Sequence, residues 1–449
     1  MTKTRLAQLL IFVAGAVLIM GACAPDDPIS GELADSALIS DDAVVPLIDL
    51  SEFSIKGDLT VPEGHVVLDV LNVGNAEHTL QVTGKSGTKS LFKDDKTLLD
   101  LGELSPGTYE LFCDIPGHRE SGMSATLEVL PKAEAGNITI AAERSGDGPD
   151  WARLDAAMQE SILKFPAETE GRGNLPLEPT VLADGTKEFN FTVAITPWEV
   201  EPGKIVDAWT YNGQVPGPAI SVDVGDKVRV NVQNDLPMGT DIHWHGIRTP
   251  NEMDGVAPIT QPLIESGDSF VYEFVAERAG IGMYHAHHHG QVQIPNGLFG
   301  TFTIGELPIP RGQTIGGNLI PEDLEVAQTI PMVLNDAGVI GYSLNGKSFP
   351  ATDPYVVNKD DWVAITYYNE GLQIHPMHLH QFPQLVFAKD GFPLDHPYYA
   401  DTVNIAPGER YTVLVNPDTV GTWVWHCHIL THVEREEGMF GMVTAMVVT

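Results

Sequence analysis

Pairs of histidines separated by one residue constrain this chain more than any other feature. With 16 His among 449 residues, random placement predicts about 0.6 such pairs, whereas five occur. They are His243 and His245, His285 and His287, His287 and His289, His378 and His380, and His426 and His428. Residues i and i + 2 of a β-strand point to the same face, so each pair presents two imidazoles together. Because neutral imidazole binds copper and zinc, the pairs predict metal ligands carried on strands.

The pairs repeat in two blocks of the chain. Asp241–Gly246 corresponds to His375–His380, and Met283–His287 corresponds to Val424–His428. Each block therefore has an early pair and a late pair. Duplication of a structural unit explains this order better than chance does.

Short β-type runs separated by turns fill most of the sequence. Its 44 Gly, 32 Pro and 19% charged residues suit turn-rich β domains better than helical ones. We expect an all-β chain of three consecutive Greek-key β-sandwiches at 46–132, 186–306 and 326–449. Residues 133–185 and 307–325 are expected to be linkers.

The first linker contains one helical candidate. Trp151, Leu154, Met158 and Ile162 recur at the spacing of one helix face. We expect a short helix there that packs on a neighbouring domain.

The N-terminus has the pattern of an export signal. A short basic segment precedes the apolar run Leu6–Met20, which is too short to span a bilayer, and Cys23 follows. Residues 1–22 resemble a bacterial lipoprotein signal, and residues 23–45 form an acidic tether. We expect an exported protein on the periplasmic or extracellular face of a bacterial membrane, anchored by lipid through Cys23. An ordinary signal with an incidental cysteine is the alternative.

The charge of the chain bears on its partners. With 25 Lys and Arg against 61 Asp and Glu, the formal net charge is −36. Phosphate backbones repel such a chain, so we expect no nucleic-acid partner. The three cysteines are too few and too scattered for a disulfide framework.

The first block has the ligand types of a blue-copper electron-transfer site. His78 precedes Cys113, which is followed by His118 and Met123. Two histidines, a thiolate and a weak axial methionine form such a site. The alternative is an inert buried cysteine.

The last block repeats this set with one departure. His375 lies upstream of Cys427, and His432 follows Cys427 by five residues. Met123 comes five residues after His118, but Met439 comes seven after His432. We expect Met439 as axial ligand, with Met442 as the weaker candidate.

The middle block lacks a thiolate. Thr240, Ala286 and Gln291 occupy the positions that correspond to His375, Cys427 and His432. We therefore expect this block to contribute only histidine ligands.

Taken together, residues 187–449 resemble the multicopper oxidase family, which includes laccases, and especially its two-domain members. The block before them is similar to small plastocyanin-like cupredoxins. The resemblance implies three cupredoxin domains and, per chain, two type 1 copper ions, one type 2 ion and a type 3 pair.

The resemblance also implies the roles of the ligands. His243 and His378 would bind type 2 copper. The type 3 pair would be bound by His245, His285, His287, His380, His426 and His428. Type 1 copper would be bound by His78, Cys113, His118 and Met123 in the first block, and by His375, Cys427, His432 and Met439 in the last. Asp254 would hand protons to oxygen intermediates, with loop stabilisation as the alternative, and Glu434 is a weaker candidate for the relay.

The implied function is a four-electron oxidase that reduces oxygen to water. A phenol or aromatic amine is the first-choice reductant, and we expect small phenols to reach His432 directly. Oxidation of cuprous ions, nitrite reduction and pure electron transfer are the alternatives. The first block would exchange electrons with an external donor, such as a cytochrome or a cupredoxin, or with the type 1 copper of the last block. A structural spacer or a copper reserve is the alternative role.

The resemblance also implies an assembly. The two histidine-bearing domains are adjacent and joined by a short segment, and two-domain relatives with this order close a ring of three chains. The resemblance therefore implies a homotrimer whose copper clusters lie at subunit boundaries.

Overall fold

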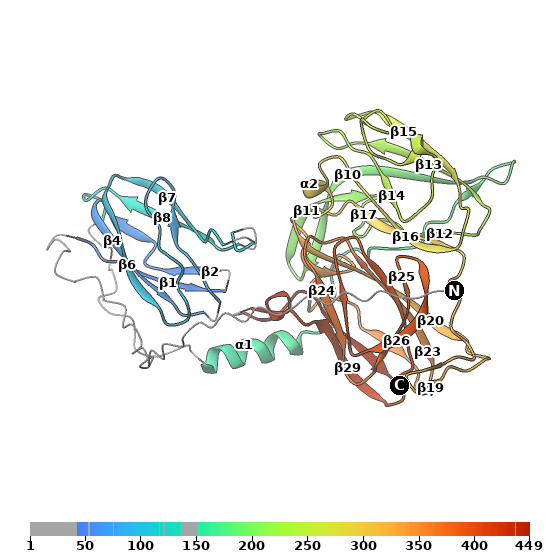
Figure 1. Ribbon diagram of the computed structural model, residues 1–449. Coiled ribbons are helices and arrows are strands. Elements are labelled where there is room, and N and C mark those ends of the chain that lie inside the picture. The colour runs from blue at the N-terminus through green and yellow to red at the C-terminus, as the bar shows by residue number, and fades with distance from the viewer. Residues whose placement is uncertain are drawn as a thin grey trace, which may run out of the picture. The chain divides into compact units, whose positions relative to one another are not determined.

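The computed structural model describes residues 43–449 except 53, 75, 116, 120–121, 136–137, 139–150 and 436 (Figure 1). The predicted export signal, Cys23 and nearly all of the predicted acidic tether therefore lie outside the described residues. The chain divides into two compact units, residues 1–146 and 147–449. Within the described part, no helix has the length and apolar character needed to cross a membrane.

The first unit contains one sandwich of two four-stranded sheets, ordered β2-β1-β4-β6 and β3-β8-β7-β5. The two sheets enclose one apolar core that includes Leu68, Leu111 and Leu127. Its strands are β1 (Leu47–Ser51), β2 (Ser54–Gly57), β3 (Thr60–Pro62), β4 (Gly64–Asn72), β5 (Gln81–Val82), β6 (Lys96–Leu104), β7 (Gly107–Phe112) and β8 (Ser124–Leu130).

The middle sandwich opens the β-structure of the second unit. Its sheets are ordered β11-β10-β13-β15, with β9 paired to β10, and β12-β17-β16-β14. Its strands are β9 (Thr180–Val181), β10 (Lys187–Glu201), β11 (Lys204–Tyr211), β12 (Ile220–Val222), β13 (Lys227–Asn234), β14 (His243–His245), β15 (Ser269–Val275), β16 (Gly280–His285) and β17 (Phe299–Ile304). Short helical turns lie at η2 (Asn251–Met253) and α2 (Gly290–Gln293).

The last sandwich follows the hairpin of β18 (Thr314–Ile315) and β19 (Asn318–Leu319). Its sheets are ordered β21-β20-β23-β28-β25-β26 and β22-β32-β29-β24-β27. Its strands are β20 (Val326–Ala337), β21 (Gly341–Leu344), β22 (Tyr355–Val357), β23 (Trp362–Asn369), β24 (His375–Leu379), β25 (Gln384–Lys389), β26 (Phe392–Ala400), β27 (Thr402–Ile405), β28 (Arg410–Val415), β29 (Gly421–Cys427) and β32 (Val443–Val448). Between β29 and β32 lie η3 (Leu430–His432) and the small hairpin of β30 (Glu434–Arg435) and β31 (Gly438–Met439).

The three sandwiches share one topology. In each, the first long strand pairs in parallel with a later strand of its sheet: β1 with β4, β10 with β13, and β20 with β23. In each, the last long strand of the second sheet pairs in parallel with a short edge strand: β8 with β3, β17 with β12, and β32 with β22. The expected all-β chain of three sandwiches is confirmed.

The middle and last sandwiches share an apolar cluster inside the second unit. Trp198 and Met283 of the middle sandwich belong to the same buried cluster as Val333 and Tyr368 of the last one. The Trp198 indole also donates a hydrogen bond to the carbonyl of Gly346 (2.7 Å). This packing holds the two sandwiches as one unit.

The linker helix is α1 (Trp151–Leu163), and it packs on β31 of the last sandwich. The expected helix and its packing are confirmed, but the expected face is wrong at one end, because Ile162 is 44% exposed and Ser161 is buried instead. The Ser161 hydroxyl accepts a hydrogen bond from the backbone of Met439 (2.8 Å). Gly438 lies against the same turn of the helix.

Gly438→Ala should therefore release α1 from the last sandwich. A Cβ at Gly438 would lie 2.4 Å from the Ser161 hydroxyl and 2.5 Å from the Ala157 carbonyl oxygen. We expect a loss of about 1–3 kcal/mol in the free energy of unfolding, as for other overpacked sites, and faster cleavage of α1 in limited proteolysis. Gly225→Ala is the matched control, because Gly225 also has a positive φ but open space around it. Equal cleavage of both variants would contradict this packing role.

Candidate metal centres

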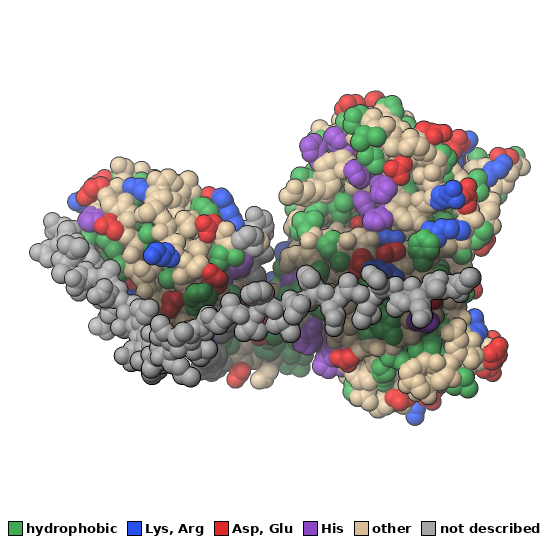
Figure 2. Space-filling view, viewed as in Figure 1, with side chains coloured by type: hydrophobic (Ala, Val, Ile, Leu, Met, Phe, Trp, Pro, Cys, Tyr) green, Lys and Arg blue, Asp and Glu red, His purple; other side chains and the backbone are tan. Residues whose placement is uncertain are grey.

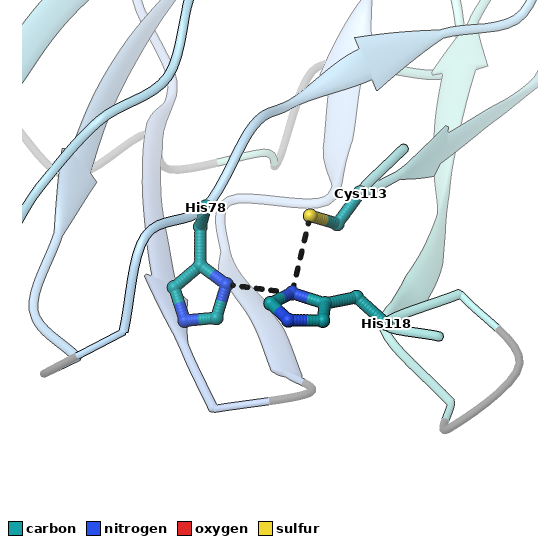
Figure 3. Close-up of side chains that lie close together, drawn as sticks. All are labelled: His78, Cys113 and His118. Carbon is teal, nitrogen blue, oxygen red and sulfur yellow. Dashed lines mark hydrogen bonds between the residues drawn. The ribbon is translucent and has the colours of Figure 1, made fainter. Parts of the chain in front are cut away.

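Three side chains of the first sandwich converge at one point, as predicted. Cys113 follows β7, and the Nδ1 atoms of His78 and His118 lie 3.2 Å apart, with Cys113 Sγ 3.5 Å from His118 Nδ1 (Figure 3). All three donor atoms lie within 4.8 Å of one another. His78 and Cys113 are fully buried, whereas His118 is half-buried.

Thr79, next to His78 in the chain, forms a hydrogen bond to the sulfur of Cys113. Its backbone N–H donates to Cys113 Sγ (3.4 Å), and its hydroxyl donates to the carboxylate of Asp114 (2.6 Å). A donor directed at sulfur stabilises the thiolate, which is the form that binds metal. The residues present therefore suit a type 1 copper ion.

The last sandwich builds the same arrangement. Cys427 Sγ lies 3.5 Å from His432 Nδ1 and 3.9 Å from His375 Nδ1. All three residues are buried, and His432 is only 1% exposed. Burial raises the pKa of the Cys427 thiol to about 12, so a metal ion must displace its proton. The expectation that small phenols reach His432 directly is wrong for this chain, because the His432 side chain is almost completely buried.

Asp336 is a partner of this centre that sequence reasoning missed. Its carboxylate lies 2.9 Å from His375 Nε2 and accepts backbone N–H groups of Leu372 and Gln373 (2.9 and 2.7 Å). Burial alone would raise the pKa of Asp336, but the hydrogen bonds from His375 and these amides outweigh it and hold that pKa below its ordinary value. In the first sandwich, by contrast, His78 Nε2 is buried without a partner among the described residues.

One pattern of backbone hydrogen bonds surrounds the corresponding position in all three sandwiches. The backbone N–H of the residue at the cysteine position donates to the carbonyl of a residue later in the chain. The backbone N–H of that later residue donates in turn to the carbonyl at the position of His118 or His432. The three sets, in this order, are Cys113, Met123 and His118; Ala286, Leu298 and Gln293; and Cys427, Met442 and His432.

This pattern places Met442, and not Met439, at the position of Met123. Met442 is fully buried in the core, whereas Met439 lies in the β30–β31 hairpin, with its amide bonded to Ser161. The expectation that Met439 would take the axial position is therefore corrected to Met442. The hairpin is inserted between His432 and Met442, which is why the spacing misled.

The middle sandwich keeps the same backbone hydrogen bonds but has none of the type 1 ligands. The Thr240 hydroxyl donates to the side-chain oxygen of Gln293 (2.7 Å), in the place of the two type 1 histidines. Gln293, not the expected Gln291, is thus the counterpart of His432. Leu298 has the backbone position of Met123, so the residues at these positions of the middle sandwich would not form a type 1 ligand set.

The paired strands place the cluster histidines in equivalent registers. His243 on β14 lies opposite His285 on β16, and His378 on β24 lies opposite His426 on β29. The corresponding pair of the first sandwich is Gln81 and Phe112. The first sandwich therefore has type 1 ligands alone, the middle one has histidine pairs alone, and the last one has both.

The backbone orients the same nitrogens in both histidine sets. His243 Nδ1 lies 2.8 Å from the carbonyl oxygen of Asp254, and His378 Nδ1 lies 3.2 Å from that of Asp401. His285 and His426 each direct Nδ1 at the carbonyl of the next residue (3.0 and 2.9 Å). Because Nδ1 is engaged by a carbonyl in each case, Nε2 is left to bind a metal.

Burial keeps two histidines of the middle set neutral. It is the largest cause that lowers the pKa of His245 to about 4, followed by the nearby Arg410 and His243. Burial likewise lowers the pKa of His285 to about 3. Imidazoles with such pKa values are uncharged at neutral pH, which is the metal-binding form.

Each histidine set makes ring contacts among its own members. Ring contacts join His243 with His245, His285 and His287, and others join His378 with His380, His426 and His428. Among the described residues, no ring contact joins one set to the other. His287, His380 and His428 are exposed, and Figure 2 shows histidine side chains on the surface of both lobes of the second unit.

The acidic residues proposed for proton transfer lie in different places. Asp254 Oδ1 is 3.6 Å from His243 Nδ1 and is partly open to solvent. Glu434 is exposed in β30, and within the described residues it has no bond to a cluster histidine, so its relay role stays a prediction. Sequence reasoning also missed the buried Asp241, whose carboxylate accepts the backbone N–H groups of His287 and His288 (2.7 and 2.8 Å).

Asp336→Asn should raise the reduction potential of the last sandwich's type 1 centre. The cupric state carries one more positive charge than the cuprous state, so the buried carboxylate on His375 stabilises it. Redox titration of the blue absorbance in a Cys113→Ser background isolates this centre. Asp401→Asn, which alters a carboxylate beside a cluster histidine, should leave the potential unchanged. An unchanged or lower potential in Asp336→Asn would refute this assignment.

The chain was compared with known proteins. Residues 192–308 and 321–448 match two family models, each described as multicopper oxidase, and together these matches span more than half of the chain. Laccase-2 of Botryotinia fuckeliana is 31% identical over 267 residues, which cover 54% of this chain and 45% of the relative. Dihydrogeodin oxidase of Aspergillus terreus is 30% identical over 282 residues, covering 56% and 46%. The chain thus spans less than half the length of these relatives.

Two solved structures agree with the fold. The multicopper oxidase mgLAC is 35% identical with a TM-score of 0.53, covering 58% of this chain and 86% of its own. Blue copper oxidase from Nitrosomonas europaea is 34% identical with a TM-score of 0.53, covering 58% and 85%. With two matched domains, cupredoxin sandwiches and two His–Cys–His centres, this chain belongs to the multicopper oxidase family.

Proposed function

We propose that the protein is a laccase-like oxidase that takes single electrons from a phenol or aromatic amine and reduces oxygen to water. The observation that carries this proposal is the position of Cys427 between His426 and His428. A type 1 ligand is thereby joined through the backbone to two cluster ligands, which gives an electron a short covalent route. Copper, when bound, would supply the one-electron redox chemistry. The protein supplies the ligands, determines how far the copper site is exposed to solvent, and places the acidic groups that transfer protons.

The alternatives fit the residues less well. A pure electron carrier needs no cluster histidines, yet eight are placed in two equivalent sets. A nitrite reductase of this architecture would carry its thiolate in the middle sandwich, where Ala286 stands. Cuprous-ion oxidation is the second candidate, although the 12 Met form no Met-rich insertion.

Asp254 is proposed as the proton donor for oxygen reduction. Its carboxylate lies beside His243 and keeps contact with solvent, so it is able to exchange protons with water. Its backbone carbonyl orients the same histidine, which combines positioning with proton supply.

The first sandwich is proposed as an electron-entry module. His118 is half-buried, whereas His432 is buried, so an external protein donor has a shorter route to the first centre. A cytochrome or another cupredoxin would be such a donor. Because Phe112 and Asp114 flank Cys113, no histidine ligand of a cluster adjoins this thiolate.

A homotrimer is proposed as the assembly. Among the described residues no ring contact joins the two histidine sets of one chain, and three of their imidazoles are exposed. A head-to-tail ring of three chains would bring the middle set of one chain against the last set of the next. The N-terminal pattern supports export and a lipid anchor at Cys23.

Oxygen uptake of the copper-loaded protein tests the function. Cys427→Ser should abolish oxygen consumption with phenols and aromatic amines while the blue absorbance of the first sandwich remains. Cys113→Ser is the matched control, since it should remove that absorbance, spare oxidation of small aromatic donors and slow oxidation of a protein donor. Oxygen uptake that survives Cys427→Ser would contradict the proposal.

A further inference from the structure

Two neighbouring histidines of the middle sandwich have no part in the roles described so far. His288 and His289 follow the cluster ligand His287 in the turn between β16 and α2. Their ring centroids lie 4.4 Å apart with an interplanar angle of 72°. Among the described residues, every other pair of histidine rings in contact joins two residues that are assigned to copper. The pair thus resembles the copper ligands in its ring arrangement.

The distance between the two rings suits a shared metal ion. The histidine rings of the two type 1 centres lie 5.1 and 5.2 Å apart, with interplanar angles of 61° and 65°. In the cluster sets the closest rings, those of His378 and His380, are 4.8 Å apart. The rings of His288 and His289 are closer than any of these. Two imidazoles that bind one ion through nitrogens at about 2.0 Å can approach to this distance.

The fold makes no use of either imidazole. Within the described residues, the side chains of His288 and His289 take part in no hydrogen bond or ion pair, and His289 begins α2 without capping it. His288 is half-buried and His289 is exposed, so ions in solution can reach both. Imidazole is the commonest metal ligand in proteins, and these two are available to bind.

The backbone holds the pair beside the cluster. The buried carboxylate of Asp241 accepts the N–H groups of both His287 and His288 (2.7 and 2.8 Å), and the N–H of Gly290 closes the turn on the His287 carbonyl (3.1 Å). His289 has φ 47° and ψ 42°, a left-handed conformation that residues other than glycine seldom adopt. Glycine would fit this position with less strain, so the imidazole is kept at a conformational cost.

We propose that His288 and His289 form a peripheral copper site that captures a cupric ion from solution and delivers it to the cluster through His287. This inference goes beyond the proposed function, because it concerns how the cluster is filled and not what the filled protein oxidises. The net charge of −36 attracts cations to the chain in general. The two imidazoles supply the selectivity, since among divalent first-row ions nitrogen ligands bind cupric copper most tightly.

Delivery is an exchange of ligands. His287 replaces one imidazole of the pair on the ion, which stays cupric, so no electron is transferred and no covalent bond of the protein breaks. His287 is exposed and adjoins the pair in the chain, whereas His285 is buried and His245 half-buried. The exposed residues therefore meet the ion first, and the buried ligands receive it afterwards.

Copper counting on the full chain tests the site. The loaded parent should hold one cupric ion more than the double variant His288→Gln, His289→Asn, and a brief wash with a weak chelator should remove that ion alone. Asparagine tolerates the left-handed backbone, so the turn should be kept. Electron paramagnetic resonance of the labile ion should show coupling to two nitrogens. His65→Gln with His396→Gln is the matched control, because it removes two histidines without a copper role and should keep the extra ion.

Loading of the copper-free protein tests delivery. With copper limiting, the His288→Gln, His289→Asn variant should fill its chelator-resistant cluster positions several-fold more slowly than the parent. The blue absorbance of the type 1 centres should appear at the parent rate in both proteins. Equal loading of the cluster in parent and variant would refute the delivery role.

The site itself is overturned if parent and variant hold equal amounts of copper, or if the control also loses the extra ion. Neither readout needs oxygen or a reductant. A parent that consumes no oxygen but carries the labile ion would therefore refute the proposed oxidase and leave the peripheral site standing.

Discussion

The metal centres depend on two backbone hydrogen bonds in each sandwich. In the last sandwich these bonds join Cys427 to Met442 and Met442 to His432. The same two bonds occur in all three sandwiches, although the side chains at these positions differ. Cys427, Ala286 and Cys113 thus occupy one backbone site, and only their side chains decide whether metal ligands converge there. The same backbone hydrogen bonds therefore support a His–Cys–His set in the first sandwich, histidine pairs in the middle one, and both in the last.

These hydrogen bonds explain how far sequence alone could lead. The histidine pairs could be recognised from the sequence because their i, i + 2 spacing lies within single strands, whereas the register that sets His378 opposite His426 required the structure. The axial ligand was misassigned because the β30–β31 hairpin lengthens the loop between His432 and Met442 without changing these bonds. Counting residues could not distinguish an insertion from a changed ligand.

Contacts between strands that are distant in the chain could not be predicted from the sequence, for a different reason. Asp336 and Tyr342 come from β20 and β21, yet both contact histidines of the last type 1 centre. Neither lies in a motif, and the topology alone brings them there. They add a buried carboxylate and a stacked ring to the surroundings of the ligands, which a list of ligands does not contain.

The central claim is that one chain carries two half-clusters and that neighbouring chains complete them. Coexpression of two inactive variants tests it directly: His243→Ala with His285→Ala in one chain, and His378→Ala with His426→Ala in the other. In a head-to-tail ring of three, a mixed assembly has one intact boundary, so oxygen uptake should return to at most about one third of the parent value. If the mixture remains as inactive as each variant alone, the two sets do not meet across chains and the account is contradicted.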